Sequence, residues 1–153
     1  MLLGLISDTH GKFDDQIPDL FRDVEQILHA GDICGHDIIA KLEQIAPVTA
    51  VLGNNDYDPQ YRDLEIVEFA GVKILINHIV PFDNPHAPIF DNIARARPDI
   101  VLYGHTHKPA DETIDGVRYL NPGYTGPARF NMRRTLATLD LAQSPAAFTL
   151  HDL

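Results

Sequence analysis

Side chains that can bind a metal ion follow five of the apolar runs in this sequence. They are Asp8, His10, Asp32, Asn54, His78, His105 and His107. Carboxylate oxygens, an amide oxygen and imidazole nitrogens together suit Mn²⁺, Fe or Zn²⁺, whereas a single cysteine argues against an iron–sulfur cluster or a cysteine zinc site. We expect Mn²⁺ first, with Fe, Zn²⁺ and Ni²⁺ as alternatives.

Seven ligands are more than one metal ion takes from protein while it keeps a water. They suit two ions that share a carboxylate, and two cations roughly 3.5–4 Å apart can activate water and stabilise both oxygens of a phosphoryl transfer. Each motif alone is weak, because an Asp-x-His pair occurs by chance and residues 54–56 are typical of a turn. The prediction rests on their combination.

The elements that must position these residues alternate along the chain. Strands are predicted at residues 2–7, 26–30, 48–52, 72–77 and 99–103, and each ends just before a candidate ligand. Ligands bind outside the carboxyl ends of strands in open α/β sheets. Glycine stands directly before the polar residue at Gly31, Gly53 and Gly104, where it permits close approach of the backbone.

Helices and hairpins complete the pattern. Helices are predicted at residues 37–45 and 89–96, with a weaker helical or irregular segment at 14–23. Hairpins are predicted for 65–77, around Asp115-Gly116, and between 135–141 and 146–151. We therefore expect one α/β domain over residues 1–153, with a mixed sheet or two sheets.

Composition limits the partners. The chain has 153 residues, with 12 Lys and Arg against 22 Asp and Glu, which gives a formal charge of −10. Such a field repels a nucleic-acid backbone, so we expect no polynucleotide partner. Seventeen of the acids are Asp, and eight His accompany them, which hints at a metal site built on loops.

The lack of a membrane-spanning run and of a signal peptide predicts where the protein is located. No apolar run is long enough to span a membrane, and the apolar start has no basic lead, so it reads as a first strand and not a signal peptide. Cys34 is the only cysteine, which fits a reducing compartment. We expect a cytoplasmic protein without a membrane partner, and homo-oligomerisation stays open.

The motifs Asp8-Thr9-His10-Gly11, Gly31-Asp32, Gly53-Asn54-Asn55-Asp56, Asn77-His78 and Gly104-His105-Thr106-His107 occur in this order, with Asn121-Pro122-Gly123 near the end. Together they resemble the signature of calcineurin-like metallophosphoesterases, in particular the small bacterial and archaeal phosphodiesterases. The resemblance runs from Asp8 to about Arg129.

The resemblance implies a four-layer αββα sandwich of two mixed sheets flanked by helices. It also implies two divalent metal ions with Asp32 as the shared ligand. The first would be held by Asp8, His10, Asp32 and His107, and the second by Asp32, Asn54, His78 and His105. The implied reaction is in-line attack on a small phosphate ester by a hydroxide that bridges the metals.

Three departures from the family pattern limit what carries over. Larger relatives have a His after the metal-binding Asn, and here that catalytic position is Asn55, which can position a phosphate but cannot act as a general acid. Ile79 stands where relatives usually have Gly, and the prolines of residues 79–88 predict a stiff loop that lies beside the second metal and shapes substrate entry. Tyr124 stands where Ser is usual, either lining the pocket or capping the core.

Two further residues carry weaker expectations. His29 is predicted to pack inside a strand, and Arg129 to form an ion pair with one of the surplus acids rather than to reach a phosphate.

Two functions from different classes remain. The first is a metal-dependent phosphodiesterase or phosphatase that acts on a small phosphate ester. The alternative is a non-catalytic protein-interaction module on the same fold, as in a retromer subunit. Such scaffolds tend to lose the ligand set, and because all seven positions here hold competent ligands, we favour the enzyme.

Overall fold

Two five-stranded mixed sheets form the centre of the computed structural model, which describes residues 1–35, 37–129 and 131–153. The first sheet has the order β10-β9-β1-β2-β3. Its strands are β1 (Leu2–Ile6), β2 (Gln26–His29), β3 (Val48–Ala50), β9 (Thr135–Asp140) and β10 (Ala147–Asp152). His36 and Phe130 lie outside the described residues.

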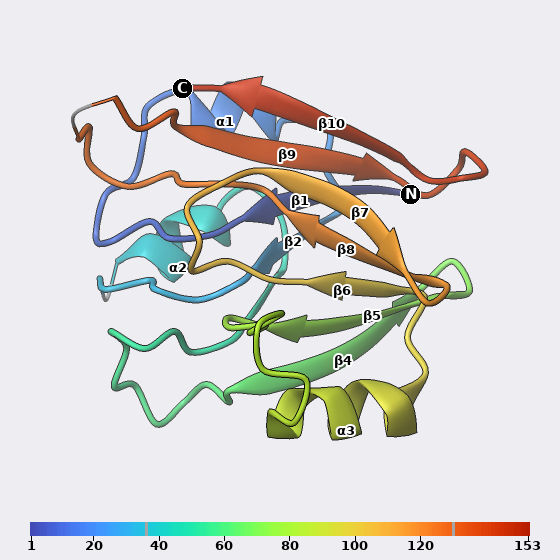
Figure 1. The fold of residues 1–153 in the computed structure, drawn as a ribbon. Coiled ribbons are helices and arrows are strands. Elements are labelled where there is room, and N and C mark those ends of the chain that lie inside the picture. The colour runs from blue at the N-terminus through green and yellow to red at the C-terminus, as the bar shows by residue number, and fades with distance from the viewer. Residues whose placement is uncertain (36, 130) are drawn as a thin grey trace.

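The second sheet has the order β4-β5-β6-β8-β7. Its strands are β4 (Leu64–Phe69), β5 (Val72–Asn77), β6 (Ile100–Leu102), β7 (Ala110–Ile114) and β8 (Val117–Asn121). In the first sheet β1, β2 and β3 are parallel and the pairings of β9 and β10 are antiparallel. In the second sheet the three central strands β5, β6 and β8 are parallel and the outer pairings are antiparallel. The carboxyl ends of β1, β2, β5 and β6 consequently point the same way, to the left in Figure 1.

Three short helices of the described residues cover the outer faces of the sheets. They are α1 (Ile17–Leu20), α2 (Ile38–Leu42) and α3 (Pro88–Ala96). Figure 1 shows α3 beside β4 and β5, on the opposite side of the molecule from α1. Pro88 fits the first turn of α3 because proline has no amide hydrogen to lose there.

Alternating side chains of the buried strands build three apolar layers. Leu3 and Leu5 of β1 belong to the cluster between the two sheets, whereas Ile6 belongs to the cluster beneath α1 and α2. Likewise Ile74 and Ile76 of β5 face the other sheet, and Leu75 packs in the cluster beneath α3. This period of two is what a strand buried on both faces requires.

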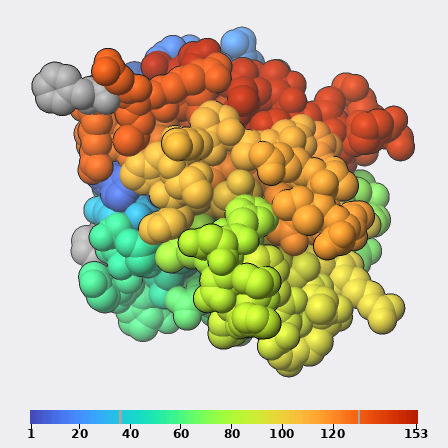
Figure 2. Space-filling view, viewed as in Figure 1, coloured from blue at the N-terminus to red at the C-terminus, as the bar shows by residue number. Residues whose placement is uncertain are grey.

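The expected four-layer αββα sandwich is thus confirmed, although its helical layers are thin. The helix expected at 37–45 ends at Leu42, and the segment at 14–23 keeps only one helical turn. The predicted hairpins are present as β4–β5, β7–β8 and β9–β10. Side chains fill the space between the ribbons on the face seen in Figure 2.

Candidate metal centre

Backbone hydrogen bonds join the loops that carry the candidate ligands. The Asp8 N–H donates to the carbonyl of Gly31 at 3.0 Å, and the His10 N–H donates to that of Asp32 at 3.0 Å. From the other sheet, the Gly104 N–H donates to the His78 carbonyl at 3.0 Å. The loops after β1, β2, β5 and β6 therefore converge on one edge, as the strand pattern predicts.

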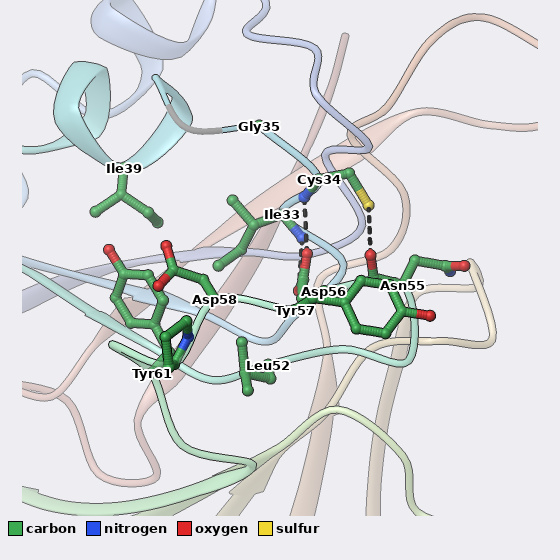
Figure 3. A pocket seen from close by; sticks show the side chains of 11 residues that line it. Ile33, Cys34, Gly35, Ile39, Leu52, Asn55, Asp56, Tyr57, Asp58 and Tyr61 are labelled. Atoms are coloured by element: carbon green, nitrogen blue, oxygen red, sulfur yellow. Dashed lines mark hydrogen bonds between the residues drawn. The ribbon is translucent and has the colours of Figure 1, made fainter.

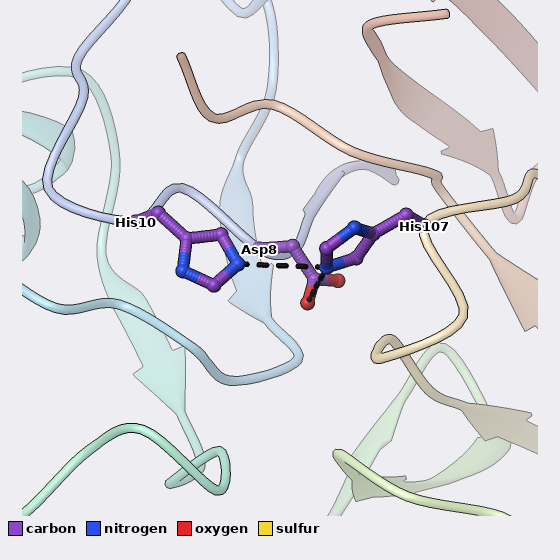
Figure 4. Close-up of side chains that lie close together, drawn as sticks. All are labelled: Asp8, His10 and His107. Atoms are coloured by element: carbon purple, nitrogen blue, oxygen red, sulfur yellow. Dashed lines mark hydrogen bonds and ion pairs between the residues drawn. The ribbon is translucent and has the colours of Figure 1, made fainter. Parts of the chain in front are cut away.

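Asp8, His10 and His107 form a first group of converging ligand atoms (Figure 4). Asp8 Oδ1 lies 3.2 Å from His107 Nε2, and the Nε2 atoms of His10 and His107 lie 3.4 Å apart. The pKa values of His10 and His107 are lowered, mainly because both rings are partly buried. Neutral imidazoles whose lone pairs point inward are suited to bind a cation.

Asp8, Asp32 and His78 form a second, fully buried group. His78 Nδ1 lies 2.7 Å from the Ala30 carbonyl, so it carries the hydrogen and leaves a lone pair on Nε2. That Nε2 lies 3.5 Å from Asp32 Oδ1 and 3.9 Å from Asp8 Oδ1. Two carboxylates therefore face a nitrogen lone pair across a short gap.

Two of these atoms have no hydrogen-bond partner within the described part of the chain. They are Asp8 Oδ1 and His78 Nε2, and both are buried. An unpaired buried polar atom costs about 1–3 kcal/mol, so native structures seldom keep one without a reason. A divalent cation between them would satisfy both, so the donor set fits the implied metal.

Asp8 is held so that only one oxygen is free. Its Oδ2 accepts hydrogen bonds from the Ser7 hydroxyl at 2.5 Å and the His105 N–H at 3.1 Å. Burial nevertheless raises the pKa of Asp8 to about 6. A nearby cation would favour the carboxylate and oppose that shift.

Asn55 lies at the edge of the open space and is hydrogen-bonded to Asp32. Its N–H donates to Asp32 Oδ1 at 2.9 Å, and its Nδ2 donates to Oδ2 at 2.7 Å. Burial alone would raise the pKa of Asp32, but these bonds and His78 hold it well below its usual range. The predicted catalytic residue thus orients a candidate ligand.

Asn54 and His105 lie at the rim of a hollow of about 350 Å³ in front of the two groups. The rings of His105 and His78 are 5.3 Å apart. His10, Asp32, Asn55 and His107 line the same hollow together with Arg129. The structure therefore brings all seven predicted ligands to one place, five in close contact and two at the rim.

Five of the seven predicted ligands have left-handed backbone conformations. Their φ angles are 54° at Asp8, 45° at His10, 54° at Asp32, 66° at His105 and 58° at His107. Such residues cost on the order of 1–3 kcal/mol each and persist where the surrounding structure holds them. Concentrated strain of this kind is typical of a functional site.

At two of the predicted glycines the neighbouring loop lies too close to leave room for a side chain. A Cβ at Gly53 would collide with the backbone and carboxylate of Asp32, and one at Gly104 would collide with the Ser7 hydroxyl. The expectation that these glycines let the loops approach is confirmed.

Sequence reasoning missed two residues that fix the loops. The Asp56 carboxylate accepts the N–H groups of Ile33, Cys34 and Gly53 at 2.8–3.0 Å, which joins the loop after β2 to the loop after β3. Buried Asn121 donates to the Gly104 carbonyl at 2.9 Å. Both stand in motifs quoted above, but nothing local indicates which backbone groups they reach.

Arg129 lines the hollow, whereas Tyr124 packs in the core against two of the candidate ligands. Tyr124 is fully buried, and its ring centroid lies 4.6 Å from that of His107 and 5.7 Å from that of His10. Arg129 lies over the Tyr124 ring at 5.6 Å. The expected ion pair of Arg129 is wrong, since no carboxylate of the described ranges lies within ion-pair distance of it.

The loop over residues 79–88 does not line the hollow, contrary to the expectation that it shapes substrate entry. Phe82 instead packs edge-on against Tyr103 and Tyr119, with ring centroids 5.6 and 5.3 Å apart. These tyrosines belong to the apolar cluster beneath α3, so the loop turns away from the metal site.

Comparison with known proteins identifies the family. Residues 1–144 match the model of the calcineurin-like phosphoesterase superfamily domain. The chain belongs to this family. A probable metallophosphoesterase of Methanothermobacter thermautotrophicus is 36% identical over 133 residues, which cover 80% of this chain and 76% of that protein.

Two solved structures extend the comparison. A structure described as a novel archaeal phosphodiesterase is 27% identical, covers 100% of both chains and has a TM-score of 0.77. Vps29 of Entamoeba histolytica, solved in complex with Zn²⁺, has a TM-score of 0.77 at 21% identity and 99% coverage of both chains. The second likeness shows the shared fold alone.

Within the described residues, the calcineurin-like domain contains no helix long and apolar enough to cross a membrane.

Proposed function

We propose that this chain is a divalent-metal-dependent phosphodiesterase that hydrolyses a small phosphate ester at a dinuclear site. The observation that carries the proposal is a pair of buried atoms, Asp8 Oδ1 and His78 Nε2, which lie 3.9 Å apart and have no hydrogen-bond partner among the described residues. Membership of the phosphoesterase family and the likeness to an archaeal phosphodiesterase support the reaction class.

The proposed ligand sets share Asp32. Its two oxygens face opposite ways, with Oδ2 3.7 Å from His10 Nε2 and Oδ1 3.5 Å from His78 Nε2. That orientation supports a bridging role between a first ion at Asp8, His10, Asp32 and His107 and a second at Asp32, Asn54, His78 and His105. When bound, two such cations would lower the pKa of a water and neutralise charge on phosphate oxygens.

The chain's own residues then bind and orient the ester. Arg129 faces the hollow without a carboxylate partner among the described residues, so its guanidinium is free to bind a phosphate oxygen. Asn55 keeps the Asp32 carboxylate in one orientation through two hydrogen bonds. Neither group supplies a proton to the leaving alcohol, which favours esters with acidic leaving groups.

The formal charge of −10 supports a small ester over a polynucleotide, since the hollow is the one place where we propose a cationic centre. Mn²⁺ remains the first choice among the metals because oxygen and imidazole ligands suit it. A cytoplasmic location is part of the proposal, on the ground of the single free Cys34.

The alternative is a non-catalytic interaction module, for which the Vps29 fold is the precedent. The convergence of all seven ligand positions favours the enzyme, because a scaffold has no need of unpaired polar atoms beneath a hollow.

Metal analysis combined with bis(4-nitrophenyl) phosphate hydrolysis tests the proposal. We expect close to two bound ions per chain and hydrolysis that EDTA abolishes and Mn²⁺ restores. Asp32→Ala should bind fewer ions and lose activity by at least a hundredfold, whereas Asp83→Ala, in the loop beside α3, should behave like the wild type. A chain that binds no metal and hydrolyses no ester would refute the proposal.

A further inference from the structure

A second hollow adjoins the metal centre and has no role in the proposal so far. It encloses about 400 Å³ and shares Asn55 with the hollow in front of the metal ligands. Its wall is mainly apolar and aromatic (Figure 3). Its lining includes Ile33, Ile39, Leu52, Tyr57, Asp58 and Tyr61.

Three separate segments build this pocket, and hydrogen bonds hold them in place. Ile33 follows β2, Ile39 belongs to α2, and the remaining residues follow β3. The Asp56 carboxylate joins the first segment to the third by accepting N–H groups from both. The pocket therefore exists before any ligand binds, as most small-molecule sites do.

The lining is suited to an uncharged flat group. Ile33 and Ile39 are buried and Leu52 is half-buried, so they offer an apolar floor. In Figure 3 the Tyr57 ring lies on the side of Asn55, and the Tyr61 ring lies at the opposite end. Aromatic side chains stack on other aromatic groups with little dependence on their identity.

Charge in the pocket excludes anions. Asp56 and Asp58 both line it, and no Lys or Arg occurs among the described residues that do. Burial and the negative charge of Asp58 raise the pKa of Tyr61. The two carboxylates oppose an anionic group, and the apolar floor favours an uncharged one. Asp58, whose Oδ1 already accepts the Gln60 N–H at 3.0 Å, can accept further hydrogen bonds from donors on that group.

Tyr57 is the residue whose placement is otherwise unexplained. It is 91% exposed, although it follows directly on the loop that Asp56 fixes. Its ring lies on the Asn55 side of the pocket (Figure 3), so it can stack on a group that enters the pocket past Asn55.

We propose that this pocket binds the organic group of the phosphate ester, and that this group is an uncharged aromatic ring with hydrogen-bond donors. The inference rests on the proposed function, which places the phosphate in the neighbouring hollow. The ester then spans the two hollows past Asn55, and the pocket sets the specificity of the site.

Two diesters with the same leaving group test the inference by activity. These are the 4-nitrophenyl esters of methyl phosphate and of thymidine 5′-phosphate. We expect kcat/KM for the thymidine ester to exceed that for the methyl ester at least tenfold. Tyr57→Ala should reduce that preference about tenfold, mostly by raising KM for the thymidine ester. Ile66→Ala, which alters an exposed apolar residue of β4 outside both hollows, should leave the preference unchanged.

Binding of thymidine itself provides a readout that needs no reaction. Titration of the purified protein in EDTA, followed by amide NMR shifts, should show saturable binding that Tyr57→Ala and Tyr61→Leu both weaken. Thymidine binding without ester hydrolysis would support the pocket while refuting the phosphoesterase. Hydrolysis without thymidine binding, or binding that neither variant weakens, would overturn the pocket and leave the phosphoesterase standing.

Discussion

His29 should make the unfolding free energy of this protein depend on pH between about 6.5 and 4. Its ring is fully buried in β2 beneath the metal site. Nδ1 accepts the Gly31 N–H at 3.2 Å, so Nε2 carries the hydrogen and donates to the Thr9 hydroxyl at 3.1 Å. The Thr9 hydroxyl in turn donates to the Ile33 carbonyl at 3.1 Å. Protonation of Nδ1 would place its N–H against the N–H of Gly31, and this hydrogen bond would be lost.

The magnitude follows from the pKa. Burial is the main cause that lowers the pKa of His29 from 6.5 to about 4. Because the unfolded chain binds the proton more readily, the neutral ring stabilises the fold above pH 6.5, and this contribution is lost as the pH falls toward 4. Each pKa unit corresponds to about 1.4 kcal/mol, so the full interval corresponds to about 3 kcal/mol.

Urea unfolding followed by circular dichroism, in EDTA at pH values from 8 to 4.5, measures this loss. His29→Gln cannot titrate, so it should be less stable than the wild type at pH 8 and should converge on it near pH 4.5. The exposed His86 gives the matched control, since His86→Gln should run parallel to the wild type. Parallel curves for wild type and His29→Gln would refute the reasoning.

Three other changes test the site. Arg129→Gln should raise KM for a nitrophenyl diester about tenfold by removing a charge-assisted hydrogen bond, with metal content unchanged by elemental analysis; lost metal would assign it a structural role instead. Gly104→Ala should lower the melting temperature and the metal content together, because its Cβ would collide with the Ser7 hydroxyl; normal values of both would contradict that geometry. Rates for aryl diesters should fall steeply with rising leaving-group pKa, and Asn55→His should flatten that dependence by supplying an acid; a flat profile in the wild type would count against the missing proton donor.

The fold and the location of the site could be predicted because their signals are local. An apolar run such as residues 2–7 specifies a strand by its composition, and the polar residue after it must lie at the strand's carboxyl end. Gly53 and Gly104 indicated where loops approach closely, and a Cβ added at either position would collide with the neighbouring loop. These inferences need no knowledge of what lies opposite each loop.

The rest depends on contacts between segments far apart in sequence. Arg129 was expected to find an acid, but the partner within reach is the ring of Tyr124. The pocket beside the metal centre combines three segments, and no single one of them suggests a cavity. The loop over 79–88 was misjudged because its prolines indicate stiffness but not direction. The packing of Phe82 on Tyr103 and Tyr119 directs the loop away from the metal ligands.

The residues of the candidate metal centre destabilise the fold that carries them. This loss of stability is itself an argument about function. Five of the candidate ligands have left-handed φ angles. Burial raises the pKa of Asp8 to about 6, while its Oδ1 has no hydrogen-bond partner among the described residues. Each of these features destabilises the isolated chain by the order of 1–3 kcal/mol. A chain selected only to present a surface would lose nothing by replacing Asp8 or His78 with apolar residues that fit the core. Their convergence is explained if a cation binds there, since it would pair the orphaned atoms and recover part of the cost through binding.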